Sequence, residues 1–133
     1  MRVGDWVEFV SITNKDGSEL AEDNWRRKLV GKIRLCMLVG GFGRVQPVYK
    51  YDIEMKDGEV TYVNLDREGN ASVSDHFPIE ISPGVWKLET CTSIYTFRVL
   101  SDEEVIQVEE AVEQAFADRI GMMFAAYENG PVS

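Results

Sequence analysis

Apolar and polar residues alternate over most of the first hundred positions, in short runs that turn-forming residues separate. A period of two is typical of β-strands, because successive side chains point to opposite faces of a sheet. The runs are also rich in β-branched and aromatic residues, which favours strands further. The pattern predicts strands over residues 6–13, 28–40, 44–55, 59–65, 77–81, 85–90 and 94–100.

The residues between these runs predict how the strands are joined. Asp57-Gly58 favours a two-residue hairpin turn, and Ser82-Pro83-Gly84 fits a type II turn with Gly at its third position. Residues 40–43 predict a Gly-rich hairpin loop, and residues 66–76 predict a polar loop. Pro47 has no amide hydrogen to donate, so its strand should lie at an edge of the sheet or carry a bulge.

The last quarter of the chain changes to a helical period. Ser101 and Glu104 have the spacing of a capping box, which predicts a helix start. Asn129-Gly130-Pro131 is a helix stop signal. Between these signals, apolar residues recur at steps of three and four and predict one stripe that faces the sheet. The stripe comprises Val105, Val108, Val112, Ala115, Phe116, Ile120, Met123, Phe124 and Tyr127.

Together these elements predict an α+β fold in a single domain over residues 1–133. Residues 5–100 should form a five- to seven-stranded, mainly antiparallel sheet or a small open β-barrel. Residues 102–128 should form one long amphipathic helix packed on it. Residues 21–28 are expected to add a short helical turn. The opening Gly4-Asp5-Trp6 resembles the start of small SH3-like barrels, which implies the barrel form of this fold.

Charge is distributed unevenly along the chain, whose net charge is −9. Residues 1–100 hold 13 Lys and Arg against 15 Asp and Glu, a balance of −2. Residues 101–133 hold only Arg119 against eight acidic residues, a balance of −7. The predicted helix therefore carries most of the excess negative charge.

The sequence also bears on the compartment. No apolar run approaches the roughly 20 residues that span a bilayer. Asp5 and Glu8 stand where a secretory signal would need an apolar core. We therefore expect a cytoplasmic protein, in which Cys36 and Cys91 are reduced.

Groups suited to catalysis or metal binding are few. The one histidine, His76, lies in the predicted polar loop. Cys91 lies in a predicted turn with Thr92 and Ser93, where no base that could activate the thiol is close in sequence. Two distant cysteines and one histidine lack the paired short spacings of a zinc site. We therefore expect no catalytic residue, no metal ion and no cofactor, and a protein that is not an enzyme.

Two groups of charged residues are candidates for binding. The first is basic and follows Trp25, and it comprises Arg26, Arg27, Lys28, Lys32 and Arg34. It could bind phosphate or single-stranded nucleic acid with Trp25 as a stacking platform, or form a solvated strand face that balances the acidic helix. The second group lies off the apolar stripe of the helix and comprises Glu103, Glu109, Glu110, Glu113 and Asp118. Such a ridge would attract a basic site on a partner and repel nucleic acid.

The leading functional hypothesis is a small acidic binding protein whose carboxylate ridge docks on a protein partner with a basic surface. Small acidic domains without catalytic motifs are similar in kind to accessory and inhibitor proteins of phages and mobile elements. The alternative is a module for a nucleotide-like ligand, bound between sheet and helix or at an oligomer interface. Its polar contacts would be Lys32, Arg34, Tyr95 and Arg98.

The predicted helix is also longer than a small sheet needs, since about 26 residues span roughly 40 Å. We therefore expect a homodimer in which part of the helix or an edge strand packs against a second copy. Trp86 and Tyr95, which alternate onto apolar strand faces, are expected to be largely buried.

Overall fold

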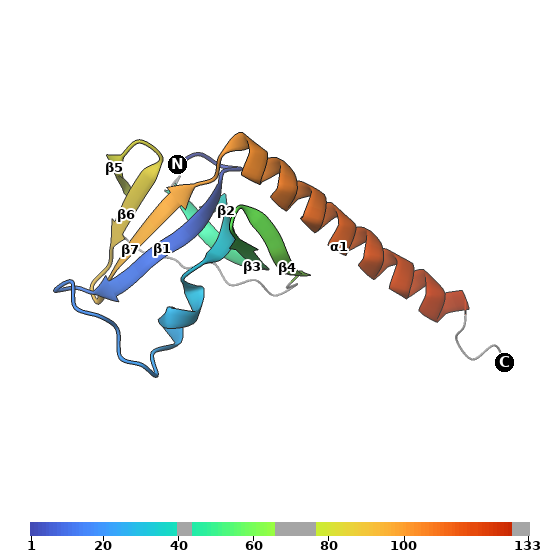
Figure 1. The fold of residues 1–133 in the computed structure, drawn as a ribbon, viewed down its shortest axis with the longest axis horizontal. Helices are drawn as coiled ribbons and strands as arrows, with labels where there is room; N and C mark the ends of the chain where they lie inside the picture. Colours follow the sequence, from blue (N-terminus) through green and yellow to red (C-terminus); the bar gives the residue numbers. More distant parts are fainter. Residues whose placement is uncertain (40–43, 66–76, 129–133) are drawn as a thin grey trace.

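The computed structural model describes residues 1–39, 44–65 and 77–128, and these residues form an open antiparallel sheet followed by a single helix (Figure 1). Within them the sheet has seven strands in the order β4-β3-β2-β1-β7-β6-β5. The predicted α+β class, the antiparallel sheet and the C-terminal helix are thus confirmed. The strands are β1 (Trp6–Asn14), β2 (Lys32–Val39), β3 (Arg44–Lys56), β4 (Glu59–Leu65), β5 (Ile79–Ser82), β6 (Val85–Glu89) and β7 (Ser93–Val99). The helices are the short 3₁₀ helix η1 (Trp25–Leu29) and the long helix α1 (Asp102–Glu128).

Both faces of the sheet carry an apolar core. Alternation along β1 places Trp6 and Val7 on opposite faces, so one strand contributes to both cores. The first core joins β1, β6 and β7 with the segment around η1, and it contains Val7, Phe9, Ile12, Leu20, Leu29, Cys36, Leu88 and Phe97. The second lies beneath α1 and contains Trp6, Ile33, Ile53, Leu100 and Val108.

The turns follow their predicted chemistry. Asp57 and Gly58 both have positive φ, 52° and 77°, as the favoured two-residue hairpin turn requires. Gly84 has a φ of 75°, which the third position of a type II turn demands. Pro47 pairs with Cys36 of β2, while the pairing of β3 with β4 covers residues 51–56. The expected edge strand is not found, because β3 lies between β4 and β2, but the pairing of β3 with β2 is irregular between Val48 and Ile53, close to the proline.

The hydroxyl groups between β6 and β7 serve the turn. The Thr90 hydroxyl oxygen accepts hydrogen bonds from the Ser93 and Thr92 amides, at 3.1 and 3.4 Å. The Thr90 amide donates to the Ser93 carbonyl at 2.9 Å. Cys91 is exposed at the tip of this turn. These bonds account for the run of small polar residues as hairpin structure.

Helix α1 begins as predicted. The Ser101 amide donates to Glu104 Oε1 at 3.0 Å, and the Glu104 amide donates to Ser101 Oγ at 3.3 Å. This reciprocal pair is the capping box. A helix of 27 residues is about 40 Å long, and Figure 1 shows its last turns extending past the edge of the sheet.

The prediction of one inward apolar stripe along α1 is wrong for the far part of the helix. Val108 is fully buried and Val112 is partly buried against the second core, but Phe116 is 57% exposed and Ile120 is also exposed. Along this part of the helix Ala115 and Arg119 border β4, so Phe116 and Ile120 lie on a side of the helix that the sheet does not cover.

Two other expectations need correction. Arg34 was expected on a solvated strand face, but only 5% of it is exposed. Trp86 and Tyr95 were expected to be largely buried, but both are half-buried and pack at the margin of the first core. The short helical turn expected at residues 21–28 is confirmed as η1.

Some predictions concern residues outside the described part of the chain. They are the loops at 40–43 and 66–76, including His76, and the stop signal at 129–131. Within the described residues, no helix is long and apolar enough to cross a membrane.

Candidate functional site

The outward face of α1 carries four of the five carboxylates that the sequence pointed to. Residues 103, 106, 110 and 113 recur at steps of three and four and so share one side of the helix. Glu103, Glu109, Glu110 and Glu113 are all exposed, and Ile106 is 56% exposed among them. We call these five residues the acidic ridge.

The carboxylates of the acidic ridge are uncompensated. Within the described residues, no salt bridge reaches Glu109, Glu110 or Glu113. Glu104, one residue from the ridge, differs because it is held by Arg98 at 2.7 Å. The ridge therefore presents unneutralised negative charge to solvent, which a basic surface would complement.

Ile106 is the member of the ridge that the sequence analysis missed. The apolar stripe was read through Val105 and Val108, which left Ile106 without a role. The spacing 103-106-110-113 could have revealed it, because it places a large apolar side chain at the centre of a ridge of glutamates. Buried apolar anchors with a polar rim are the usual centre of a protein interface.

Asp118, the fifth predicted carboxylate, is not part of this ridge. It is exposed, but its Oδ1 accepts a hydrogen bond from Gln114 Nε2 at 2.8 Å. With Val63, Asn64, Ala115, Arg119 and Met122 it lines a hollow of about 340 Å³ between β4 and α1. Asp118 therefore lies on the side of the helix that borders the sheet.

The structure does not bring together the four residues proposed for a nucleotide-like ligand. Tyr95 and Arg98 lie on opposite faces of β7, since they are three positions apart along the strand. Tyr95 packs against the first core, whereas Arg98 borders α1. Lys32 and Arg34 lie on β2. Neither the hollow beside β4 and α1 nor the one beside β1 and η1 is lined by any of the four.

All four of these side chains have identified partners within the protein, Arg34 among them through the Ile33 carbonyl at 2.9 Å. Lys32 Nζ lies 2.8 Å from Asp52 Oδ1 and 2.5 Å from Glu54 Oε1. The Tyr95 hydroxyl accepts a hydrogen bond from Arg26 Nε at 3.0 Å. These partners would have to be displaced before a phosphate could bind.

Arg98 joins the sheet to the start of α1. Its Nη1 and Nη2 donate to the two carboxylate oxygens of Glu104 at 2.7 and 2.8 Å, and Nη2 lies 2.6 Å from Glu8 Oε2. The hydrogen bonds from Arg98 lower the pKa of Glu104 to about 2. The cluster therefore fixes the direction in which α1 leaves the sheet, and with it the orientation of the acidic ridge.

A second exposed surface lies around η1. Trp25 is 59% exposed, and the Arg26 guanidinium carbon lies 5.2 Å from the centre of its ring. Next to η1, a hollow of about 410 Å³ is bounded by β1 and the segment that leads to η1. Val10 and Val30, both exposed, are among its lining residues. We call Val10, Trp25, Arg26, Lys28 and Val30 the Trp25 patch.

Neither thiol has the surroundings of a nucleophile. Burial raises the pKa of Cys36 to about 12, so that thiol stays protonated near neutral pH. Cys91 is exposed in its hairpin turn. In the described part of the chain, no group of three or more His, Cys, Asp and Glu side chains is placed to share a metal ion.

Comparisons of this chain with models of protein families, with curated proteins and with solved structures found no match.

Proposed function

We propose that this protein is a non-enzymatic binding protein, of the accessory or inhibitor kind, and that the acidic ridge of α1 docks on a protein partner. The partner would present basic residues around an apolar pocket. Glu103, Glu109, Glu110 and Glu113 would face the basic rim, and Ile106 would enter the pocket.

The observation that carries this proposal is the composition of one helix face. Exposed glutamates without salt bridges surround an exposed isoleucine, on a helix that the Arg98 cluster holds in a fixed direction. Rim charges mainly steer encounter and select the partner, while a central apolar side chain contributes most of the affinity. The face contains both kinds of residue.

Purification with matched baits tests the proposal. The test bait changes Glu109, Glu110 and Glu113 to Gln. The control bait changes Glu22, Glu59 and Glu80 to Gln, which removes the same charge from exposed positions on other elements. A partner that uses the ridge should be retained by the control bait and lost from the test bait.

Kinetics with that purified partner complete the test. The Gln triple variant should lower the association rate about tenfold at low salt, and the wild-type rate should fall as salt rises. Ile106→Ser should mainly raise the dissociation rate. Partners that bind the two triple variants equally well, at rates that salt does not change, would contradict the proposal.

A further inference from the structure

We propose that α1 also docks on a second copy of this chain. The first turns of each α1 stay on their own sheet, and its later turns lie on the Trp25 patch of the other copy. This inference rests on the docking role proposed above for α1 and names one binding partner of that helix, a second copy of the chain.

The docking part of α1 is a strip that shares Glu109 and Glu113 with the acidic ridge and continues toward the C-terminal end of the helix. Glu109, Glu113, Phe116 and Ile120 are separated by steps of four, three and four, so they lie along one side of the helix. All four are exposed. The strip therefore presents two carboxylates followed by two large apolar side chains. Apolar side chains of this size in a row are typical of helices that lie in a groove of another protein.

The Trp25 patch offers the matching chemistry. In a 3₁₀ helix, residues three apart lie on the same side, so Trp25 and Lys28 form one row of η1. Beside this row, Val10 and Val30 line the hollow of about 410 Å³. Phe116 or Ile120 of a second copy would find apolar surface there, and Trp25 is of the residue type most enriched at binding hot spots.

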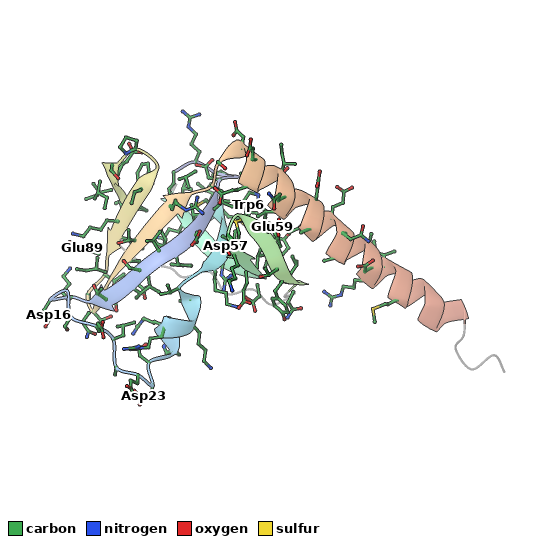
Figure 2. The ribbon with its side chains drawn as sticks, viewed as in Figure 1. Trp6, Asp16, Asp23, Asp57, Glu59 and Glu89 are labelled. Atoms are coloured by element: carbon green, nitrogen blue, oxygen red, sulfur yellow. The ribbon has the colours of Figure 1, made fainter. Side chains whose placement is uncertain are left out.

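Charge selects this pairing over others. Helix η1 contains three basic residues, Arg26, Arg27 and Lys28. Two backbone carbonyl oxygens hold the Arg27 guanidinium in place, because its Nε donates to Ala21 at 2.9 Å and to Leu20 at 3.0 Å. Glu19 is the one carboxylate among the residues that line the hollow, and Figure 2 shows Asp23 at the far tip of the preceding loop, away from the sheet. Pairing two α1 helices side by side in parallel would instead bring Glu109 and Glu113 of both copies together, which like-charge repulsion disfavours.

The arrangement also fits a closed dimer. The core around η1 and the core beneath α1 lie on opposite faces of the sheet, and Figure 1 shows the far end of α1 extending past the edge of the sheet. A two-fold axis between η1 and this helix end would bring each helix end to the η1 of the other copy, so the contact is made twice. Stable interfaces bury at least about 1,000 Å². One helix strip on one short helix is a small contact, but a two-fold dimer makes it twice and leaves no open end.

Charge reversal and sedimentation equilibrium of the full chain test the pairing. Lys28→Glu alone and Glu113→Lys alone should each raise the dimer dissociation constant about tenfold. The double variant restores opposite charges across the interface and should return the constant to within about threefold of wild type. Lys56→Glu, at an exposed position of the β3–β4 hairpin, is the matched control and should leave the constant unchanged.

Loss of apolar contact gives a second measure. Trp25→Ala and Phe116→Ala should each raise the dissociation constant at least tenfold. An equimolar mixture of the two should form more dimer than either alone, because the mixed dimer keeps one intact contact. Monomers at every concentration, or a dimer that these substitutions do not weaken, would overturn the inference.

The experiments distinguish a failure of self-docking from a failure of the proposed function. Trp25 and Lys28 lie outside α1, so their variants test self-docking without changing the acidic ridge. If those variants leave the dimer unchanged while the Gln triple variant still loses its partner, self-docking is wrong and the proposed function stands. If the dimer responds as expected but the Gln triple variant keeps every partner, the proposed function is wrong and the helix serves self-association.

Discussion

Two cysteines illustrate how the tertiary environment of a residue decides its chemistry. Cys36 is fully buried in the first core, with its Sγ 3.8 Å from Met1 Sδ, and its pKa is raised to about 12 by burial. Cys91 is exposed in a hairpin turn. Because the thiolate is the reactive form, the exposed Cys91 should react much faster with alkylating reagents than the buried Cys36.

Native labelling with iodoacetamide at pH 8 should therefore modify Cys91 and leave Cys36 unmodified. Complete labelling of both is expected after unfolding in guanidinium chloride. Mass spectrometry of the intact chain and its peptides measures the outcome. The Cys91→Ser variant is the control, since its native form should take up no label. Rapid modification of Cys36 in that variant would contradict the burial of this residue.

Glu104 combines two roles at the residue scale. It completes the capping box and accepts both hydrogen bonds from Arg98. Its folded-state pKa of about 2 lies below the ordinary value of 4.5. A depressed pKa stabilises the fold at pH values above 4.5, and this contribution is lost as the pH falls toward 2.

Glu104→Gln should lower the free energy of unfolding at pH 7 by about 1–2 kcal/mol, a range reduced for the solvent screening of the partly exposed Arg98. Gln keeps a capping-box side chain, so the change isolates the charge. Near pH 2.5 the difference from wild type should shrink below about 0.5 kcal/mol. Urea unfolding at both pH values measures this, with Glu103→Gln as a control. An equal difference at both pH values would contradict the ion pair.

At the scale of the element, the two halves of the continuous helix α1 have different surroundings. Its first turns bury Val108 beneath the sheet and are held by Arg98. Its later turns leave Phe116 and Met122 exposed at 57% and 73%. Apolar burial stabilises the fold only where a partner surface exists. The inward side of the first part therefore serves stability, whereas the large apolar side chains of the later part are available for docking.

This division predicts unequal costs of substitution along one helix. Val108→Ala should destabilise the monomer by about 1–3 kcal/mol because it leaves a cavity in the second core. Phe116→Ala should change stability by less than about 0.5 kcal/mol, although its side chain is larger. Urea unfolding at low protein concentration, where monomers predominate, measures both. A greater loss from Phe116→Ala would mean that the far part of α1 is buried within its own chain.

At the scale of the whole molecule, charge is separated between sheet and helix. Residues 101–133 carry −7 of the total of −9, and the acidic ridge places much of that charge on one exposed face. Several basic side chains of the sheet are engaged with carboxylates, as Arg98 and Lys32 are. The net field should therefore repel polyanions and attract cationic surfaces.

The protein should consequently bind neither duplex DNA nor single-stranded RNA at 150 mM salt. Nucleic-acid affinity depends chiefly on basic residues that neutralise phosphates, and among the described residues few of these are without a partner. Fluorescence anisotropy with labelled oligonucleotides of mixed sequence measures the result. Micromolar binding that Trp25→Ala or Lys28→Glu weakens would instead identify the surface around η1 as a nucleic-acid site.

Local rules in the sequence determined most of the elements. The period of two predicted the strands, Asp57-Gly58 and Gly84 predicted turns that the backbone angles confirm, and Ser101 with Glu104 predicted the helix start. Each signal acts over a few neighbouring residues, through steric limits on the backbone or short hydrogen bonds. Such interactions are present in the sequence before any distant segment is placed.

Only the tertiary structure decided which side chains are buried or engaged across long separations. The sequence pattern treats Val108 and Phe116 as members of one stripe, but the sheet covers only the first. It places Arg34 on a polar strand face, but packing buries that residue. It cannot join Arg98 to Glu8, which lie 90 residues apart in the chain. Ile106 became part of the acidic ridge only when the direction of α1 was known, because exposure depends on where an element meets its neighbours.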